Sequence, residues 1–88
     1  MNKYALITGA SSGIGLEFAR IFAQDGINLI LVARSIETLE LIKNELQKQH
    51  NIDIHVIGLD LSKIESIKTL TNYTEKNNIT VEYLVNNA

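Results

Sequence analysis

Four short apolar runs, separated by longer amphipathic segments, constrain the fold of this chain most strongly. The runs cover residues 4–7, 27–33, 54–59 and 81–85, and all are rich in Ile, Leu and Val. Such runs are typical of strands that are buried on both faces of a parallel sheet. Because the segments between them have helical patterns, the order strand, helix, strand, helix, strand, helix, strand predicts one α/β domain with right-handed crossovers.

The segments between the runs carry apolar side chains at helical spacing. In chain order the stripes are Ile14, Phe18, Ile21 and Phe22; Leu39, Ile42 and Leu46; and Ile64, Ile67 and Leu70. Gly26 stands where the first helix is expected to end, and Ser35 is placed to cap the second. Ser62 and Glu65 have the spacing of a capping box, which predicts the start of the third helix.

Composition narrows the classes of partner. The 8 basic residues, against 10 acidic ones, are scattered along the 88 residues, so no basic cluster for nucleic acid is present. The longest apolar run, residues 27–33, is too short to span a bilayer. The sequence has no cysteine, which excludes disulfides and thiolate metal sites. We expect no nucleic-acid or membrane partner and, by default, a cytoplasmic location.

The stretch TGASSGIG, residues 8–15, lies between the first predicted strand and the first predicted helix. This turn falls at the carboxyl edge of the sheet, where doubly wound folds bind their ligands. Gly9, Gly13 and Gly15 would let a phosphate reach the unpaired N–H groups of the helix. Their spacing differs from G-x-G-x-x-G, and Leu16 replaces the lysine of a Walker loop. A tight turn that binds nothing is the alternative interpretation.

The run TGASSGIG resembles the T-G-x-x-x-G-I-G signature of the short-chain dehydrogenase/reductase family. GLDLS at residues 58–62 looks like the family's aspartate segment after the third strand, and LVNNA at residues 84–88 looks like its Asn-Asn-Ala-Gly segment after the fourth. The resemblance extends from Lys3 to Ala88. We expect a partial Rossmann-like, doubly wound parallel sheet of four strands in order 3-2-1-4, with two helices on one face and the third on the other.

The same resemblance implies a dinucleotide site. The implied contacts are Gly9, Ser11, Ser12, Gly13, Ile14 and Gly15 for the pyrophosphate and adenosine ribose, Asp60 and Leu61 for the adenine, and Asn87 and Ala88 for the ribose region. Asn86 and Thr8 are implied to tie the fourth strand to the first turn. Taken alone, Asp60 is explained equally well as an acidic residue before a helix capped by Ser62, and Asn86 and Asn87 as turn residues.

The end of the second predicted strand favours NADP over NAD. Enzymes that bind NAD place an acidic residue about 20 positions beyond the glycine turn, where it accepts hydrogen bonds from the ribose hydroxyls. In this sequence the residues around that position are Ala33, Arg34 and Ser35, so no carboxylate is available. A guanidinium can pair with a 2′-phosphate, and Arg34 also resembles what NADP-preferring family members show. We expect Arg34 and Ser35 to bind the 2′-phosphate; a solvated arginine is the alternative.

No catalytic residue is predicted within the 88 residues. The family uses a tyrosine with a lysine four positions later, whereas Tyr73 has Asn77 at that spacing and is interpreted as a surface or packing residue. His50 and His55 have no partner at metal-ligand spacing, so no metal site is predicted and edge or solvated positions are expected for them.

The family's last motif would continue with glycine after Ala88. We therefore expect residues 1–88 to be the amino-terminal, dinucleotide-binding part of a longer oxidoreductase, which transfers a hydride between NADP(H) and a carbonyl or alcohol. The alternative is a non-catalytic nucleotide-binding or regulatory module. A single helix cannot cover one face of the predicted sheet, and the fourth strand is an open edge, so we also expect marginal folding or self-association of the 88 residues.

Overall fold

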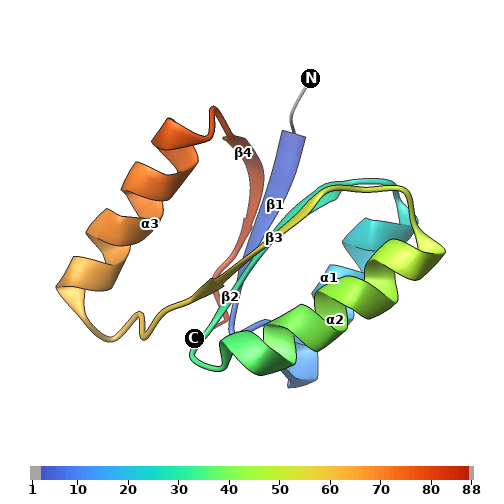
Figure 1. Ribbon diagram of the computed structural model, residues 1–88, viewed down its shortest axis with the longest axis horizontal. Helices are drawn as coiled ribbons and strands as arrows, with labels where there is room; N and C mark the ends of the chain where they lie inside the picture. Colours follow the sequence, from blue (N-terminus) through green and yellow to red (C-terminus); the bar gives the residue numbers. More distant parts are fainter. Residues whose placement is uncertain (1–2, 88) are drawn as a thin grey trace.

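The computed structural model describes residues 3–87 and shows a four-stranded sheet with helices on both faces (Figure 1). The strands are β1 (Lys3–Thr8), β2 (Asn28–Ala33), β3 (Ile54–Gly58) and β4 (Thr80–Val85). The helices are α1 (Gly13–Gln24), α2 (Ile36–Gln49) and α3 (Ile64–Lys76). All neighbouring strands are parallel, and their order is β3-β2-β1-β4. The expected Rossmann-like, doubly wound arrangement is confirmed.

The helices begin and end mostly where local signals place them. Gly26, two residues after the end of α1, has φ +74°, a left-handed conformation that favours glycine. The Ser35 hydroxyl caps α2 by accepting a hydrogen bond from the Thr38 N–H at 3.4 Å. The predicted capping box of α3 is wrong, because the helix has Lys63 at its N-cap position and no side-chain cap bond. Ser62 instead donates to Asp60, which precedes the helix.

Two apolar layers hold the helices to the sheet. α1 and α2 lie on one face, over a cluster that includes Ile7, Leu31 and Leu39 (Figure 1). α3 lies on the other face, over a smaller cluster formed by Tyr4, Leu6, Ile30 and Val32. β1 and β2 contribute to both clusters. The expectation of strands buried on both faces is therefore confirmed for these two central strands.

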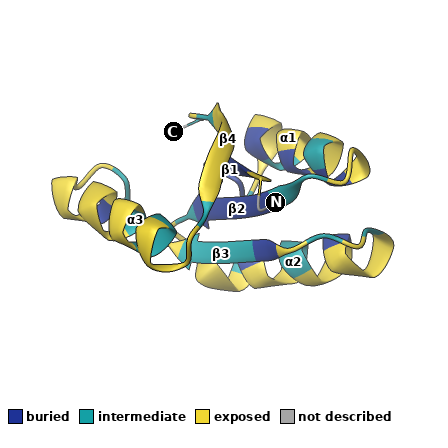
Figure 2. Cartoon of the chain, turned by 90° about the horizontal axis from the view of Figure 1, so that it is seen from above, coloured by how far each residue is buried: buried dark blue, intermediate teal, exposed yellow. Residues whose placement is uncertain are grey.

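The edge strands do not meet that expectation. β4 is exposed over most of its length, and Leu84 keeps 68% of its surface in contact with solvent (Figure 2). β3 is only partly buried beyond Ile54. Each edge strand has only one neighbouring strand in the sheet. On the face where α3 lies, that single helix covers little of the sheet. The central strands therefore carry most of the core.

The apolar stripe predicted for α1 lies on a helix, but only Phe22 of its four residues packs against the core. Ile14 is 65% exposed and Ile21 is 53% exposed, whereas Gly15, Ala19 and Ala23 are buried. Small side chains let the helix backbone approach the strands closely, while Ile14, Phe18 and Ile21 stay exposed. Among residues 3–87, no helix is long and apolar enough to cross a membrane.

Candidate functional site

A groove of about 750 Å³ runs along the carboxyl ends of the strands. It is formed by the segments that follow β1, β2, β3 and β4, which lie far apart in the sequence. The lining residues are Gly9, Ser11, Ser12, Gly13, Ile14, Val32, Ala33, Arg34, Ser35, Leu59, Asp60, Leu61, Ser62 and Asn87. This set contains every residue predicted to bind the cofactor except Gly15, which is buried in α1, and Ala88, which lies outside the described residues.

The three glycines of the first turn have different roles. An added Cβ at Gly9 would overlap the backbone carbonyl of Asn87, and one at Gly15 would overlap the backbone carbonyl of Gly9. These two glycines let segments of the chain pack closely against one another. Gly13 has φ +59°, and no atom lies within 4 Å of a Cβ built there. Its open side belongs to the groove, so Gly13 leaves space for another molecule to approach the backbone.

The amino terminus of α1 opens into this groove without a cap. Ser12 is the N-cap residue, in extended backbone conformation, and its side chain makes no cap hydrogen bond. The first turn carries no acidic residue. Unpaired N–H groups and the positive end of the helix dipole therefore remain available at Gly13 and Ile14. This arrangement is suited to binding an anion such as a phosphate.

Thr8 ties the end of β4 to the glycine turn. Its Oγ1 lies 3.4 Å from the Val85 carbonyl oxygen and 3.2 Å from Asn86 Oδ1, and it accepts a hydrogen bond from the Asn87 N–H at 2.8 Å. The contact implied between Thr8 and Asn86 is therefore present. It places Asn87 beside Gly9 and closes one end of the groove.

Charged and polar groups line the other end of the groove. Arg34 directly follows β2, and Asp60 lies in the segment after β3. Asp60 Oδ1 accepts hydrogen bonds from Ser62 Oγ at 2.7 Å and from the Ser62 N–H at 3.0 Å. These bonds from Ser62, with smaller contributions from Arg34 and Lys63, lower the pKa of Asp60. Asp60 is thus an ionised acceptor held in place by Ser62, and Ser62 does not cap α3.

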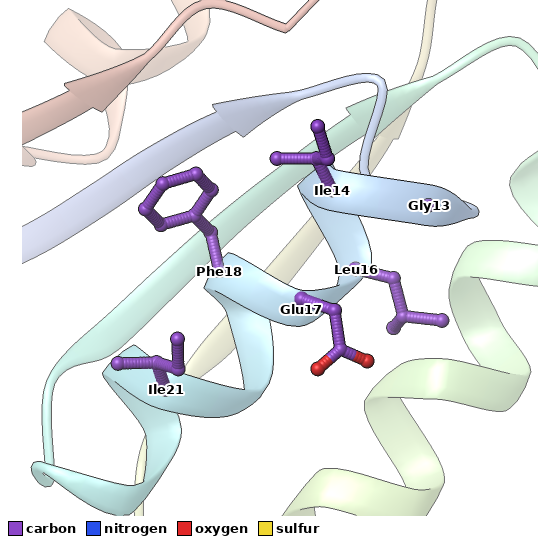
Figure 3. Close-up of a pocket in the computed structure, with 6 residues that line it drawn as sticks. All are labelled: Gly13, Ile14, Leu16, Glu17, Phe18 and Ile21. Atoms are coloured by element: carbon purple, nitrogen blue, oxygen red, sulfur yellow. The ribbon is translucent and has the colours of Figure 1, made fainter.

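A second hollow, of about 490 Å³, lies on the outer surface of α1 and was not predicted (Figure 3). It is lined by Gly13, Ile14, Leu16, Glu17, Phe18 and Ile21. The two hollows share Gly13 and Ile14. The spacing of the apolar residues was visible in the sequence, but spacing alone does not reveal which face of a helix is left uncovered.

A polar cluster at the other end of the sheet was also missed. His55 Nε2 lies 3.0 Å from Asp53 Oδ2, and His55 Nδ1 lies 2.6 Å from the Tyr73 hydroxyl. Tyr4 donates a hydrogen bond to the same Asp53 oxygen. His55 does lie on an edge strand, as expected, but it is not simply solvated. Within residues 3–87, no group of three or more His, Cys, Asp or Glu residues could hold a metal ion.

We compared the chain that forms this groove with known protein families and proteins. The family model for short chain dehydrogenases matches residues 3–88. The chain is 41% identical over 86 residues to a fatty acyl-CoA reductase of Acinetobacter baylyi, covering 98% of the chain and 29% of that protein. It is 36% identical over 86 residues to a very-long-chain 3-oxoacyl-CoA reductase of Debaryomyces hansenii, covering 98% of the chain and 25% of that protein.

Solved structures agree with the sequence relatives. L-Sorbose reductase from Gluconobacter frateurii, crystallised with NADPH and L-sorbose, matches with a TM-score of 0.91 and 32% identity. The match covers 99% of this chain and 33% of the reductase. The chain thus spans only about a quarter to a third of the length of these relatives. With its four parallel strands, its glycine turn and these matches, the chain belongs to the short-chain dehydrogenase family.

Proposed function

We propose that the groove binds NADP(H), and that the chain supplies the dinucleotide-binding part of an oxidoreductase acting on carbonyl or alcohol groups. The observation that carries this proposal is the amino terminus of α1. Gly13 begins the helix with an open side, and Ser12 leaves the first N–H groups without a side-chain cap. A pyrophosphate can accept hydrogen bonds from those groups and is favoured there by the helix dipole.

The remaining groove residues fit the other parts of a dinucleotide. Asp60 is ionised and can accept a hydrogen bond from the exocyclic amino group of an adenine, and Leu61 offers an apolar surface beside it. Asn87, held by Thr8 near Gly9, lies toward the part of the groove proposed for ribose. Ala88, next along the chain, is proposed to share this contact. Gly15 contributes by bringing α1 close to Gly9.

The preference for NADP rests on the end of β2. Ala33, Arg34 and Ser35 all line the groove, and none of them is acidic. Arg34 can pair with the two negative charges of a 2′-phosphate, and Ser35 can add a hydroxyl contact. An acidic residue would be needed there to favour the free ribose hydroxyls of NAD. The bound NADPH of the sorbose reductase is consistent with this choice.

Bound NADP(H) would supply the hydride of a carbonyl–alcohol conversion. The residues of this chain would hold and orient the cofactor, because no tyrosine of the sequence is followed by a lysine at the fourth position. That absence allows, as a second candidate, a nucleotide-binding module that performs no chemistry. Both candidates require the same binding groove, so cofactor binding tests them together. A turnover assay of the whole protein separates them.

The test of the cofactor choice is Arg34→Ala, with binding of NADPH and NADH measured by fluorescence titration. We expect NADPH to bind about 10- to 150-fold more weakly, the range for loss of hydrogen bonds to a charged group, while NADH binding changes little. Arg20→Ala is the matched control, because Arg20 pairs with Glu17 and Glu45 and does not line the groove. Equal losses for both cofactors would remove Arg34 from the 2′-phosphate.

A further inference from the structure

The polar cluster on the α3 side of the sheet joins three elements of the fold. Tyr4 belongs to β1, His55 to β3 and Tyr73 to α3, while Asp53 directly precedes β3. The His55 ring lies edge-on to both tyrosines, with ring centroids 5.5 Å apart in each pair. Hydrogen bonds run from Tyr4 to Asp53, between Asp53 and His55, and between His55 and Tyr73. One imidazole thus connects the sheet to α3.

α3 has few other attachments to the sheet. Ile64 is 74% exposed and Ile67 is 54% exposed, and among the described residues of the helix only Ser66 is buried (Figures 1 and 2). Leu70 packs against the apolar cluster beneath it. Within residues 3–87, the bond between His55 and Tyr73 is the one side-chain hydrogen bond that links α3 to a strand. Tyr73 therefore provides one of the few specific attachments of this helix to the sheet.

The ionisation states of Asp53 and Tyr73 indicate which group donates and which accepts in each hydrogen bond of the cluster. The bond from Tyr4 lowers the pKa of Asp53, so this carboxylate is ionised and can only accept. His55 Nε2 must then carry the hydrogen that points to Asp53. In the neutral ring this leaves Nδ1 as an acceptor, and the Tyr73 hydroxyl donates to it. Burial, assisted by the charge of Asp53, raises the pKa of Tyr73, so the hydroxyl keeps its proton.

We propose that His55 and Tyr73 form a latch that holds α3 on the sheet and thereby positions the segment 59–63, which carries Asp60 and Leu61 into the groove. This segment connects β3, where His55 lies, to α3, where Tyr73 lies. Its residues Leu59 to Ser62 line the groove. When the latch is open, the segment keeps the packing of Leu59 and Leu61 against the apolar cluster but loses the fixed position of α3 at its carboxyl end. His55 and Tyr73 are positioning residues, and their effect on the cofactor rests on the proposed function.

The state of the His55 ring tests the latch without any substitution. Nitrogen-15 NMR of the histidine rings distinguishes a protonated nitrogen from an unprotonated one. The proposal predicts a hydrogen on His55 Nε2, bonded to Asp53, and a hydrogen bond between Nδ1 and Tyr73. His50, which ends α2 and is outside the cluster, provides the internal reference. A His55 ring with no hydrogen bond at Nδ1 would overturn the latch, and a ring with no hydrogen on Nε2 would overturn the assignment of the bond to Asp53.

Tyr73→Phe removes the hydroxyl and keeps the ring, and Tyr83→Phe on β4 is the matched control. Amide hydrogen exchange is expected to accelerate about two- to tenfold in α3 of the Tyr73 variant, with β1 and β2 unchanged. Amides of residues 59–62 should shift, and NADP⁺ should bind about two- to tenfold more weakly. Equal acceleration in all elements, or none in α3, would refute the latch. If the wild-type chain binds no NADP⁺, the proposed function fails, while exchange and ring NMR still decide the latch.

Discussion

α1 and α2 lie side by side on one face of the sheet, yet their amino termini are built differently. α2 begins at a serine whose hydroxyl caps the helix, and it buries Leu39 and Leu46 against the strands. α1 begins at Gly13 with no side-chain cap, and it packs through its small residues. A cap satisfies N–H groups within the chain, whereas a bare terminus leaves them for a ligand. The difference indicates that α2 serves stability and that the start of α1 serves binding.

The largest effect is expected where α1 meets the glycine turn. Gly15→Ala places a Cβ against the Gly9 carbonyl oxygen, a backbone atom that cannot move aside without shifting the turn. We expect a loss of about 3 kcal/mol or more in the free energy of unfolding. Urea denaturation followed by circular dichroism measures it. A variant as stable as the wild type would show that close packing of α1 on the turn is not required.

The next largest effect compares the stability lost when a large apolar side chain is truncated in α2 and in α1. Leu39→Ala in α2 should cost about 2–5 kcal/mol, because Leu39 is fully buried and its removal leaves a cavity. Ile21→Ala in α1 should cost less than about 1 kcal/mol, because Ile21 faces outward and transfers little apolar surface to water. Thermal unfolding of both variants is the measurement. Similar losses would mean that the outer face of α1 is covered, for example by self-association, which sedimentation would detect.

The smallest predicted effect is the difference in stability between substitutions of the two serines that precede α2 and α1. Ser35→Ala removes the cap of α2 and should lower the free energy of unfolding by about 1 kcal/mol. Ser12→Ala removes a hydroxyl that makes no cap hydrogen bond, so stability should stay within about 0.5 kcal/mol of wild type. Both values come from urea denaturation under identical conditions. A larger loss at Ser12 would contradict the interpretation of α1 as an uncapped helix.

Local signals in the sequence predicted the elements better than the way they pack. The alternation of apolar runs and helical patterns predicted the strands and helices, whereas the strand order was expected from the family resemblance together with the rules for crossovers. Gly26 and Ser35 marked helix ends because their backbone and capping roles are local. The stripe of α1 was misleading for Ile14, Phe18 and Ile21, since periodicity defines a face but not the surface it meets. Ser62 failed as a cap because Asp60, two residues earlier, takes its hydrogen bonds.

For the site, too, local motifs were predicted better than contacts that depend on packing. Nearly all predicted groove residues come together, because the carboxyl ends of parallel strands meet at one edge and the motifs follow those strands. The polar cluster could be seen only in part. Asp53 and His55 stand two positions apart, but the contact of His55 with Tyr73 depends on the angle at which α3 lies on the sheet. No short sequence pattern encodes that angle.

The central claim is that the bare amino terminus of α1 binds the phosphates of a dinucleotide. Titration of the isotopically labelled chain with NADP⁺, followed by amide NMR, tests it most directly. We predict saturable shifts at Gly13 to Gly15, Arg34 and Asp60. Gly13→Val should abolish these shifts while far-UV circular dichroism stays close to native, because the added Cβ enters open space at a strain of about 1–2 kcal/mol. Absence of shifts at Gly13 to Gly15, or shifts confined to Phe18 and Ile21, would contradict the claim.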